Sequence, residues 1–202
     1  MDGAELDKLS LPEYIRYIHG LPWEEFITEA FRKSGTFYVS TLYEKALEIK
    51  AKAIVELGMM IGQSTHALLK VAMENGGHLY SIETNRDSLP LVGEALKSGG
   101  LDTSFWTAIH GDDLEVVKTW VKPIDLLFVD TLHTYEQTLN ELKAYSKFIV
   151  EHGIIILHDT YVEPSRLVKK AIDDWMNLNR DWTYEDITPH NDGWGLGLLK
   201  RR

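Results

Sequence analysis

A strand, a glycine turn and a helix start follow one another in Ala53-Ile-Val-Glu-Leu-Gly-Met-Met-Ile-Gly-Gln-Ser-Thr65. The first five residues have the apolar composition of a short, buried parallel strand. Gly58 and Gly62 permit a tight turn and the close approach of a ligand to the backbone. Ser64 or Thr65 is expected to cap the following helix, because either hydroxyl accepts a hydrogen bond from a free helical N–H group. The stretch is therefore predicted to be a ligand-binding turn.

An acidic residue inside this stretch restricts the ligand. Glu56 places a carboxylate near the end of the strand, where it repels a phosphate and favours a cationic or hydroxyl-bearing ligand. Gln63 stands where a triphosphate-binding loop requires lysine. Met60 occupies the second glycine of the dinucleotide fingerprint, where a pyrophosphate needs bare backbone. The turn does not fit a nucleoside triphosphate, and an NAD-dependent oxidoreductase remains only as an alternative.

Composition narrows the class of protein. The 202 residues suffice for one domain with a substantial core, and none of them is cysteine, which excludes disulfides, cysteine-bound zinc and a thiol nucleophile. The net charge of −10 argues against nucleic-acid binding and against binding to anionic membranes. The sequence shows neither a signal-peptide core nor an apolar run of about 18 residues. A cytoplasmic protein is expected.

The rest of the chain alternates between strand and helix patterns, as βαβ units do. Residues 1–50 read as helices, which form either a lid over a substrate site or a cap at one edge of the core. Residues 51–202 are expected to form an open, mostly parallel α/β sheet that ends in an antiparallel hairpin, within a single domain 1–202. The expected strands are Ala53–Leu57, His78–Glu83, Phe105–His110, Ile124–Asp130, Gly153–His158, Trp182–Ile187 and Gly195–Leu199, and the expected helices are 64–74, 86–98, 113–120, 135–150 and 164–179.

Acidic residues follow each of the first five predicted strands. In an open α/β sheet, ligands bind at the carboxyl ends of the strands, and a buried carboxylate there is costly unless a cation, a metal or a hydrogen-bond donor answers it. Glu83 lies about where a carboxylate accepts hydrogen bonds from both ribose hydroxyls of a nucleoside. Gly111-Asp112 is then expected beside the adenine, although Asp112 and Asp113 are equally suited to capping a helix.

These motifs resemble those of class I S-adenosylmethionine (SAM) dependent methyltransferases. The similarity covers roughly residues 50–162, and within that superfamily it is closest to metal-dependent small-molecule O-methyltransferases of the catechol type and of the macrolide-sugar and cephalosporin-hydroxylase-like type. The resemblance implies a Rossmann-like, seven-stranded sheet. The motifs that carry it are Val55-Glu-Leu-Gly-Met-Met-Ile-Gly-Gln-Ser64, Ser81-Ile-Glu-Thr-Asn85, Ala95-Leu-Lys-Ser-Gly-Gly-Leu101, Leu127-Phe-Val-Asp130 and Ile156-Leu-His-Asp-Thr160.

The resemblance also assigns a donor site. It implies that the methionine part of SAM is bound by the glycine turn, the ribose by Glu83 and the adenine region by Asp112. Met60, Gly111 and Asp130 complete the predicted cofactor contacts. The residues of the turn that are expected to contact the methionine part are Glu56, Gly58, Gly62 and Ser64.

A second cluster is predicted to hold a metal. Asp130 and Asp159 end adjacent central strands, so their carboxylates repel each other unless a divalent cation lies between them. Oxygen ligands favour Mg²⁺ or Mn²⁺, and His158 or Thr160 is expected to complete the site. The resemblance implies that His133 is the general base. The alternatives are ordinary strand-end or capping roles for the carboxylates, and a helix-start role for the histidine.

Together these features predict an enzyme that transfers a methyl group from SAM to a hydroxyl of a small molecule, assisted by a divalent metal. A metal-independent methyltransferase acting on another nucleophile and a non-catalytic cofactor-binding module remain as alternatives. The apolar N-terminal helices make a homodimer plausible.

Overall fold

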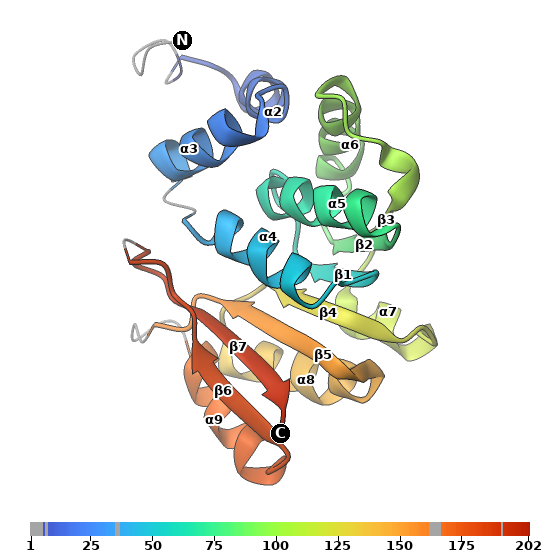
Figure 1. Cartoon of the computed structure of the whole chain (residues 1–202), viewed down its shortest axis with the longest axis vertical. Coiled ribbons are helices and arrows are strands. Elements are labelled where there is room, and N and C mark those ends of the chain that lie inside the picture. Colours follow the sequence, from blue (N-terminus) through green and yellow to red (C-terminus); the bar gives the residue numbers. More distant parts are fainter. Residues whose placement is uncertain (1–5, 7, 35–36, 162–166, 191) are drawn as a thin grey trace.

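The computed structural model describes residues 6, 8–34, 37–161, 167–190 and 192–202. Its centre is a seven-stranded sheet with the strand order β3-β2-β1-β4-β5-β7-β6, in which β7 runs antiparallel to both β5 and β6. The predicted fold, an open and mostly parallel sheet with a terminal hairpin, is confirmed (Figure 1). The strands are β1 (Ala53–Leu57), β2 (His78–Glu83), β3 (Trp106–His110), β4 (Ile124–Val129), β5 (Ile149–His158), β6 (Trp182–Asp186) and β7 (Leu196–Arg201).

Helices cover both faces of the sheet. Side chains alternate along each strand, so Ile54 and Leu126 pack on one face while Val55 and Leu127 pack on the other. The helices that pack on the first face are α2 (Leu11–His19), α3 (Trp23–Ser34), α4 (Tyr38–Glu48), α5 (Gln63–Asn75) and α6 (Ser88–Ser98). Those that pack on the second are α7 (Asp113–Val116), α8 (Tyr135–Tyr145) and α9 (Val168–Leu178).

Several boundaries differ from the sequence prediction, among them those of α5, α8 and α9. Helix α5 begins at Gln63 with Gly62 in a left-handed conformation, so neither Ser64 nor Thr65 caps it. Helix α8 ends at Tyr145, and a 3-10 turn leads to Ile149, which pairs with Ile124 as the start of β5. Ile149 was predicted to be helical, but its β-branched side chain packs in the second core cluster from a strand. Helix α9 begins at Val168, and the predicted residues 164–166 lie outside the described part of the chain.

Within the first-face layer, the N-terminal helices also pack closely on other helices. Helix α2 contacts α6, and α4 contacts α5. Figure 1 shows α2 and α3 stacked beyond α5, at the end of the molecule opposite the C-terminal hairpin. Among the described residues, no helix is long and apolar enough to cross a membrane.

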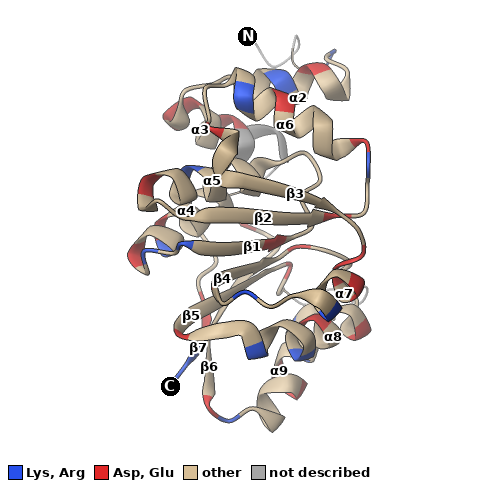
Figure 2. Cartoon of the chain, turned by 90° about the vertical axis from the view of Figure 1, so that its right-hand side faces the viewer, with Lys and Arg blue, Asp and Glu red and all other residues tan. Residues whose placement is uncertain are grey.

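The carboxyl ends of the parallel strands carry the acidic residues that the sequence predicts there. Figure 2 shows the acidic residues at the ends of β1 and β2 and on α7 on the same side of the sheet. The residues that follow β1 and β4 are hydrogen-bonded to neighbouring strands at this edge: the N–H of Gly58 donates to the carbonyl of Ile82, and the N–H of Asp130 donates to the carbonyl of Leu57. The candidate site residues therefore converge from β1, β2 and β4.

Candidate active site

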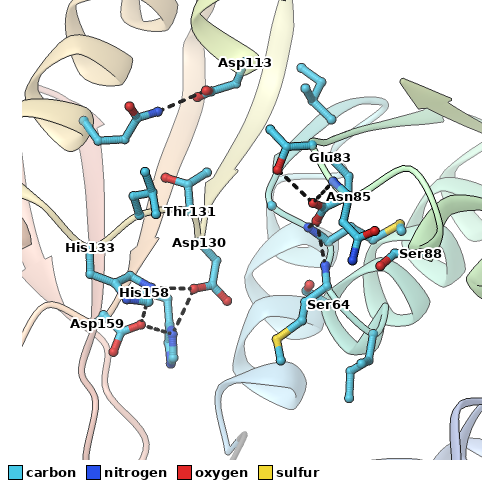
Figure 3. Close-up of a pocket in the computed structure, with 18 of the residues that line it drawn as sticks. Ser64, Glu83, Asn85, Ser88, Asp113, Asp130, Thr131, His133, His158 and Asp159 are labelled. Carbon is cyan, nitrogen blue, oxygen red and sulfur yellow. Dashed lines mark hydrogen bonds and ion pairs between the residues drawn. The ribbon is translucent and has the colours of Figure 1, made fainter. Parts of the chain in front are cut away.

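A cavity of about 720 Å³ opens at the carboxyl ends of β1, β2, β4 and β5. It has two halves, which Figure 3 shows facing each other and which are named for the methyl donor and the methyl acceptor that the sequence predicts there. The donor half contains Ser64, Glu83 and Asn85, and the acceptor half contains Asp130, His133 and Asp159. Most of the predicted site residues line it, but Glu56 and Gly62 do not. The lining is Tyr38, Gly58, Met59, Met60, Ile61, Gln63, Ser64, Ile82, Glu83, Thr84, Asn85, Ser88, Gly111, Asp112, Asp113, Asp130, Thr131, Leu132, His133, Gln137, His158, Asp159 and Trp194.

The glycine turn of the donor half depends on two residues that tolerate no side chain. Gly58 has φ +83°, and a Cβ atom there would lie 2.1 Å from the carbonyl oxygen of Asp130. Gly62 has φ +81°, and its Cβ would lie 2.4 Å from a methyl group of Val92. Met60 also has a positive φ, of 49°, and its side chain is 75% exposed above the turn. Gly62 thus shapes the turn from behind, while Gly58 and Met60 face the cavity.

Glu83 holds the turn through backbone hydrogen bonds. Its Oε2 atom accepts from the N–H groups of Met59 and Met60, both at 2.9 Å, and its Oε1 atom accepts from the N–H of Asn85 at 2.7 Å. Partial burial raises the pKa of Glu83, but these bonds outweigh that effect and hold the pKa below its ordinary value. The carboxylate stays ionised and lines the cavity, and Oε1 also accepts from the Thr84 hydroxyl at 3.3 Å.

Glu56 lies beneath the turn instead of in the cavity. It is fully buried, and its Oε2 atom accepts from Thr65 at 2.8 Å and from Ser81 at 2.5 Å. Burial raises its pKa to about 7 despite these bonds. Thr65 therefore supports the turn through Glu56, while Ser64 lines the cavity next to it.

Asp112 and Gly111 lie where the sequence places them, after β3. The Asp112 carboxylate caps α7 by accepting from the N–H groups of Leu114 and Glu115. Gly111 donates its N–H to the carbonyl of Glu83. Both residues line the cavity as well, so the capping of α7 leaves Asp112 at the cavity wall.

A buried histidine pair ties the N-terminal helices to the turn. His19 Nε2 lies 2.8 Å from the carbonyl oxygen of Ile61, and His19 Nδ1 lies 3.1 Å from His66 Nδ1. Because a carbonyl only accepts, His19 carries its proton on Nε2, and His66 Nδ1 donates to His19. Burial lowers the pKa of His19 to about 4 and that of His66 to about 3, so both rings are neutral near pH 7.

The acceptor half is built from two carboxylates and two imidazoles. His133 Nε2 lies 2.7 Å from Asp159 Oδ2 and 3.3 Å from Asp130 Oδ1. His158 Nδ1 lies 3.0 Å and 3.4 Å from the same two oxygens (Figure 3). Tyr38 donates its hydroxyl to Asp130 Oδ2 at 3.2 Å. The four charged groups therefore alternate around one point.

Mutual attraction sets their protonation. Hydrogen bonds to Asp130 and Asp159 raise the pKa of His133 to about 9, and the same carboxylates overcome burial to raise the pKa of His158 to about 10. Burial raises the pKa of Asp130, but the two imidazoles outweigh it and bring the value to about 2. The pKa of Asp159 is lowered for the same reason. At neutral pH two positive rings balance two carboxylates.

This group fits a divalent cation by the chemistry of its donors. One oxygen or nitrogen atom from each of Asp130, His133 and Asp159 lies within 4.8 Å of the others. The set that converges contains His133 where the sequence predicted His158. His158 is only 8% exposed and packs against Tyr38, with ring centroids 4.2 Å apart and the rings tilted by 44°, whereas the His133 side chain is 31% exposed at the cavity.

The backbone around Asp159 is strained and is held by the C-terminal hairpin. Asp159 has φ +57°, in the left-handed region that non-glycine residues rarely adopt. The next two N–H groups, of Thr160 and Tyr161, donate to the carbonyls of Gly195 and Trp194. Trp194 also lines the cavity. Thr160 therefore anchors the hairpin through its backbone N–H, and its place as a metal ligand stays a prediction.

Two aromatic residues, Tyr38 and Trp194, line the cavity. Trp175 packs in the core against Trp182, and Tyr161 lies outside the lining. Sequence reasoning missed Gln137, whose side chain reaches the cavity wall from α8. Its spacing of four residues from Glu141 on a helix was the available signal.

Comparison with known proteins now adds to this geometry. Residues 55–160, about half of the chain, match a family described as a methyltransferase domain. The chain belongs to this family. The matched region of the methyltransferase domain runs from β1 to the residues just after β5, so it includes both halves of the cavity. Suspected membership of the methyltransferase class is confirmed.

Individual relatives are more distant. The chain is 25% identical over 124 residues to the O-methyltransferase hkm8 of Aspergillus hancockii. The match covers 58% of this chain and 46% of that protein. The chain thus spans about half the length of this curated relative. Two solved structures share the fold: the O-methyltransferase TomG of Streptomyces achromogenes in complex with SAM (TM-score 0.67, 18% identity, 81% of this chain and 78% of the other) and the O-methyltransferase of Bacillus cereus in complex with SAH (TM-score 0.69, 15% identity, 96% and 92%).

Proposed function

We propose that this methyltransferase domain transfers the methyl group of SAM to a hydroxyl of a small molecule. One observation carries the proposal: a single cavity joins the turn held by Glu83 to the group of Asp130, His133 and Asp159. Its volume of about 720 Å³ lies within the range of sites that enclose a small ligand. The family match and the O-methyltransferase relatives support the same reaction.

The donor half suits an adenosine ligand with a positive charge. The Glu83 carboxylate is fixed by the backbone and lines the cavity, and a ribose diol would bind to it in place of the long hydrogen bond from Thr84. The cavity wall also carries Asp112, Asp113 and Asp130, which favour a sulfonium cation over a phosphate. In the proposed step an oxygen lone pair of the acceptor forms the new C–O bond as the C–S bond breaks. The electron pair of that bond stays on sulfur, and the hydroxyl proton is released.

A divalent cation is the second part of the proposal. When bound, such a cation supplies a Lewis acid that orients the acceptor oxygen and lowers the pKa of its hydroxyl. Asp130 and Asp159 would hold it with His133, because these three residues form the convergent group and His133 is the more exposed of the two histidines beside the carboxylates. The protonated rings of His133 and His158 carry two positive charges, which balance the two carboxylates. A divalent cation carries the same charge and would balance them equally.

His133 thereby receives a different role from the predicted general base. A base must hold a free lone pair, whereas the two nearby carboxylates raise the pKa of His133 to about 9, so that its ring is protonated near pH 7. Binding of Mn²⁺, followed by electron paramagnetic resonance, separates the two roles. Loss of Mn²⁺ affinity in His133→Ala assigns a ligand, whereas retained affinity with lost turnover restores the base.

Calorimetry tests the donor. We expect SAM and its demethylated product to bind, and NAD not to bind. Tight binding of NAD without binding of SAM would end the proposal. Release of the demethylated product in the presence of a panel of hydroxylated small molecules then distinguishes an enzyme from a non-catalytic binding module, and full turnover after treatment with EDTA would remove the metal.

A further inference from the structure

A second pair of carboxyl groups lies in the wall between the two halves of the cavity. Asp113 of α7 is 7% exposed and Glu141 of α8 is completely buried. Neither group takes part in the reaction proposed above. Two buried carboxyl groups in contact are costly when both are ionised, so their arrangement requires an explanation.

The hydrogen bonds around the pair reach only one of the two carboxyl oxygens of each residue. Gln137 Nε2 donates to Asp113 Oδ1 at 3.0 Å and to Glu141 Oε1 at 2.9 Å. Thr131 Oγ1 donates to the same Glu141 oxygen at 2.5 Å. The remaining oxygens, Asp113 Oδ2 and Glu141 Oε2, are buried and accept no hydrogen bond from these donors or from the other described residues. The side chains of Asp113 and Glu141 also interact directly, so one proton shared between them would satisfy both atoms.

The position of the pair connects the two halves of the cavity. Asp113 follows Asp112 at the start of α7, on the donor side, and its backbone carbonyl accepts from the hydroxyl of Tyr145. Thr131 follows Asp130 directly and opens the loop that carries His133. Figure 3 shows Asp113 and Thr131 on the wall above the Asp130 group, where both line the cavity. A fixed Glu141 therefore fixes Thr131 next to the acceptor half.

We propose that Asp113 and Glu141 share one proton and that this pair positions Thr131, and with it the loop 130–133, against the start of α7. They are positioning residues for the methyltransferase site, and this statement of their purpose rests on the function proposed above. The existence of the pair and its effect on the loop do not depend on that function.

The electrostatics of the pair support a single negative charge at neutral pH. Burial and the charge of Asp113 raise the pKa of Glu141 to about 8, and burial also raises the pKa of Asp113. The other ionisable groups facing the pair are Asp112, which raises the pKa of Asp113 further, and Tyr145, whose own pKa is raised by burial. Above pH 8 the shared proton is lost, and two like charges then push the bridge apart.

Hydrogen exchange of the peptide 128–136 tests the pair without any assay of activity. Corrected for the intrinsic effect of pH, exchange in the wild type is expected to rise about tenfold from pH 7 to pH 9, one unit above the pKa of Glu141. Glu141→Gln is isosteric and always neutral, so its rise should be smaller than that of the wild type by about this factor. Deprotonation of His133, whose pKa is about 9, contributes equally in both proteins. Glu141→Leu should show fast exchange at both pH values. Glu136→Gln, an exposed change on the same helix, should behave as the wild type does.

The pH profile of turnover gives the functional reading. We expect kcat/KM to fall more steeply above pH 8 in the wild type and in Glu136→Gln than in Glu141→Gln. The proposal is overturned if Glu141→Gln exchanges as fast as Glu141→Leu at pH 7, or if its rise in exchange at pH 9 equals that of the wild type. If the exchange results hold while no variant releases demethylated product, the pair stands and the proposed function fails.

Discussion

The two halves of the cavity stabilise their carboxylates by different means. In the donor half, Glu83 is held by three backbone N–H groups. In the acceptor half, Asp130 and Asp159 are held by the side chains of His133 and His158. Backbone donors stay in place as long as the fold exists, whereas an imidazolium can lose its proton or give way to another cation.

This difference teaches which part of the site is adaptable. The donor half is fixed before any ligand arrives, as a site for one constant cofactor requires. The acceptor half holds its charge balance in side chains, so it can exchange two protons for a metal ion. The following predictions either break this division or sharpen it, and they run from the largest expected effect to the smallest.

Gly58→Ala should damage both halves at once. The left-handed φ of +83° costs about 1–2 kcal/mol for alanine, and the overlap of its Cβ with the Asp130 carbonyl adds about 1–3 kcal/mol. Urea unfolding should show the loss, and calorimetry should show weakened binding of SAM. Gly76→Ala is the control, because Gly76 has φ +62° but nothing within 4 Å of the new Cβ. Equal losses in the two variants would show that the contact with Asp130 carries no strain.

Asp159→Asn should affect the acceptor half alone. Mutation of a residue that hydrogen-bonds to a metal ligand typically lowers metal affinity by about 10- to 100-fold. Replacement of a ligand itself should cost at least as much, so Mn²⁺ affinity should fall by about 10²-fold or more. The affinity for SAM should remain, because Asp159 does not contact the glycine turn. Paramagnetic resonance and calorimetry measure the two quantities, with the exposed Asp173→Asn as the control. A parallel loss of SAM affinity would contradict the division.

Glu83→Gln is the converse test on the donor half. The amide nitrogen cannot accept from the N–H groups of Met59 and Met60, and a hydrogen bond to a charged group is worth about 1.5–3 kcal/mol. SAM affinity should therefore fall about tenfold or more, while Mn²⁺ affinity stays unchanged. Glu94→Gln, exposed on α6, serves as the control. If Mn²⁺ binding fell as well, the halves would not be independent.

The pH dependence of stability should report the imidazoles. The pKa of His158 is raised to about 10, so its stabilising effect is complete below the ordinary histidine pKa of about 6.5 and is lost as the pH rises toward 10. In EDTA, the difference in melting temperature between the wild type and His158→Gln should be a few degrees near pH 6 and should narrow toward pH 10. His152→Gln, an exposed change, should show no such trend. A constant difference would disprove the ionic pairing.

Much of the fold followed from the sequence because β1, β2 and β4 are short apolar runs bounded by glycine or acidic residues. The bounds of β1 and β2 are as predicted, and β4 ends one residue earlier. The start of β5 was missed because Ile149 continues the helical spacing of α8 in sequence and is drawn into β5 by pairing with Ile124. Such pairing is a tertiary effect, which no local pattern contains.

The site was predictable only as a set of strand ends. Parallel strands bring their carboxyl ends together, so the closeness of Asp130 and Asp159 could be inferred from their strands. Which histidine joins them could not, since His133 and His158 both follow or end these strands and only side-chain direction separates them. Glu56 shows the opposite case: its position near the turn was right, but alternation along β1 turns its side chain into the interior.

The hydrogen bond from His19 to the carbonyl of Ile61 has a consequence for building chimeras. An engineer who exchanges the N-terminal helices of two such enzymes, hoping to transplant acceptor choice, would also exchange one support of the cofactor turn. The graft would need to bring His19 together with His66, because the proton that orients one ring is supplied by the other. The N-terminal helices and the cofactor turn are separate along the chain, but these hydrogen bonds make them one structural unit.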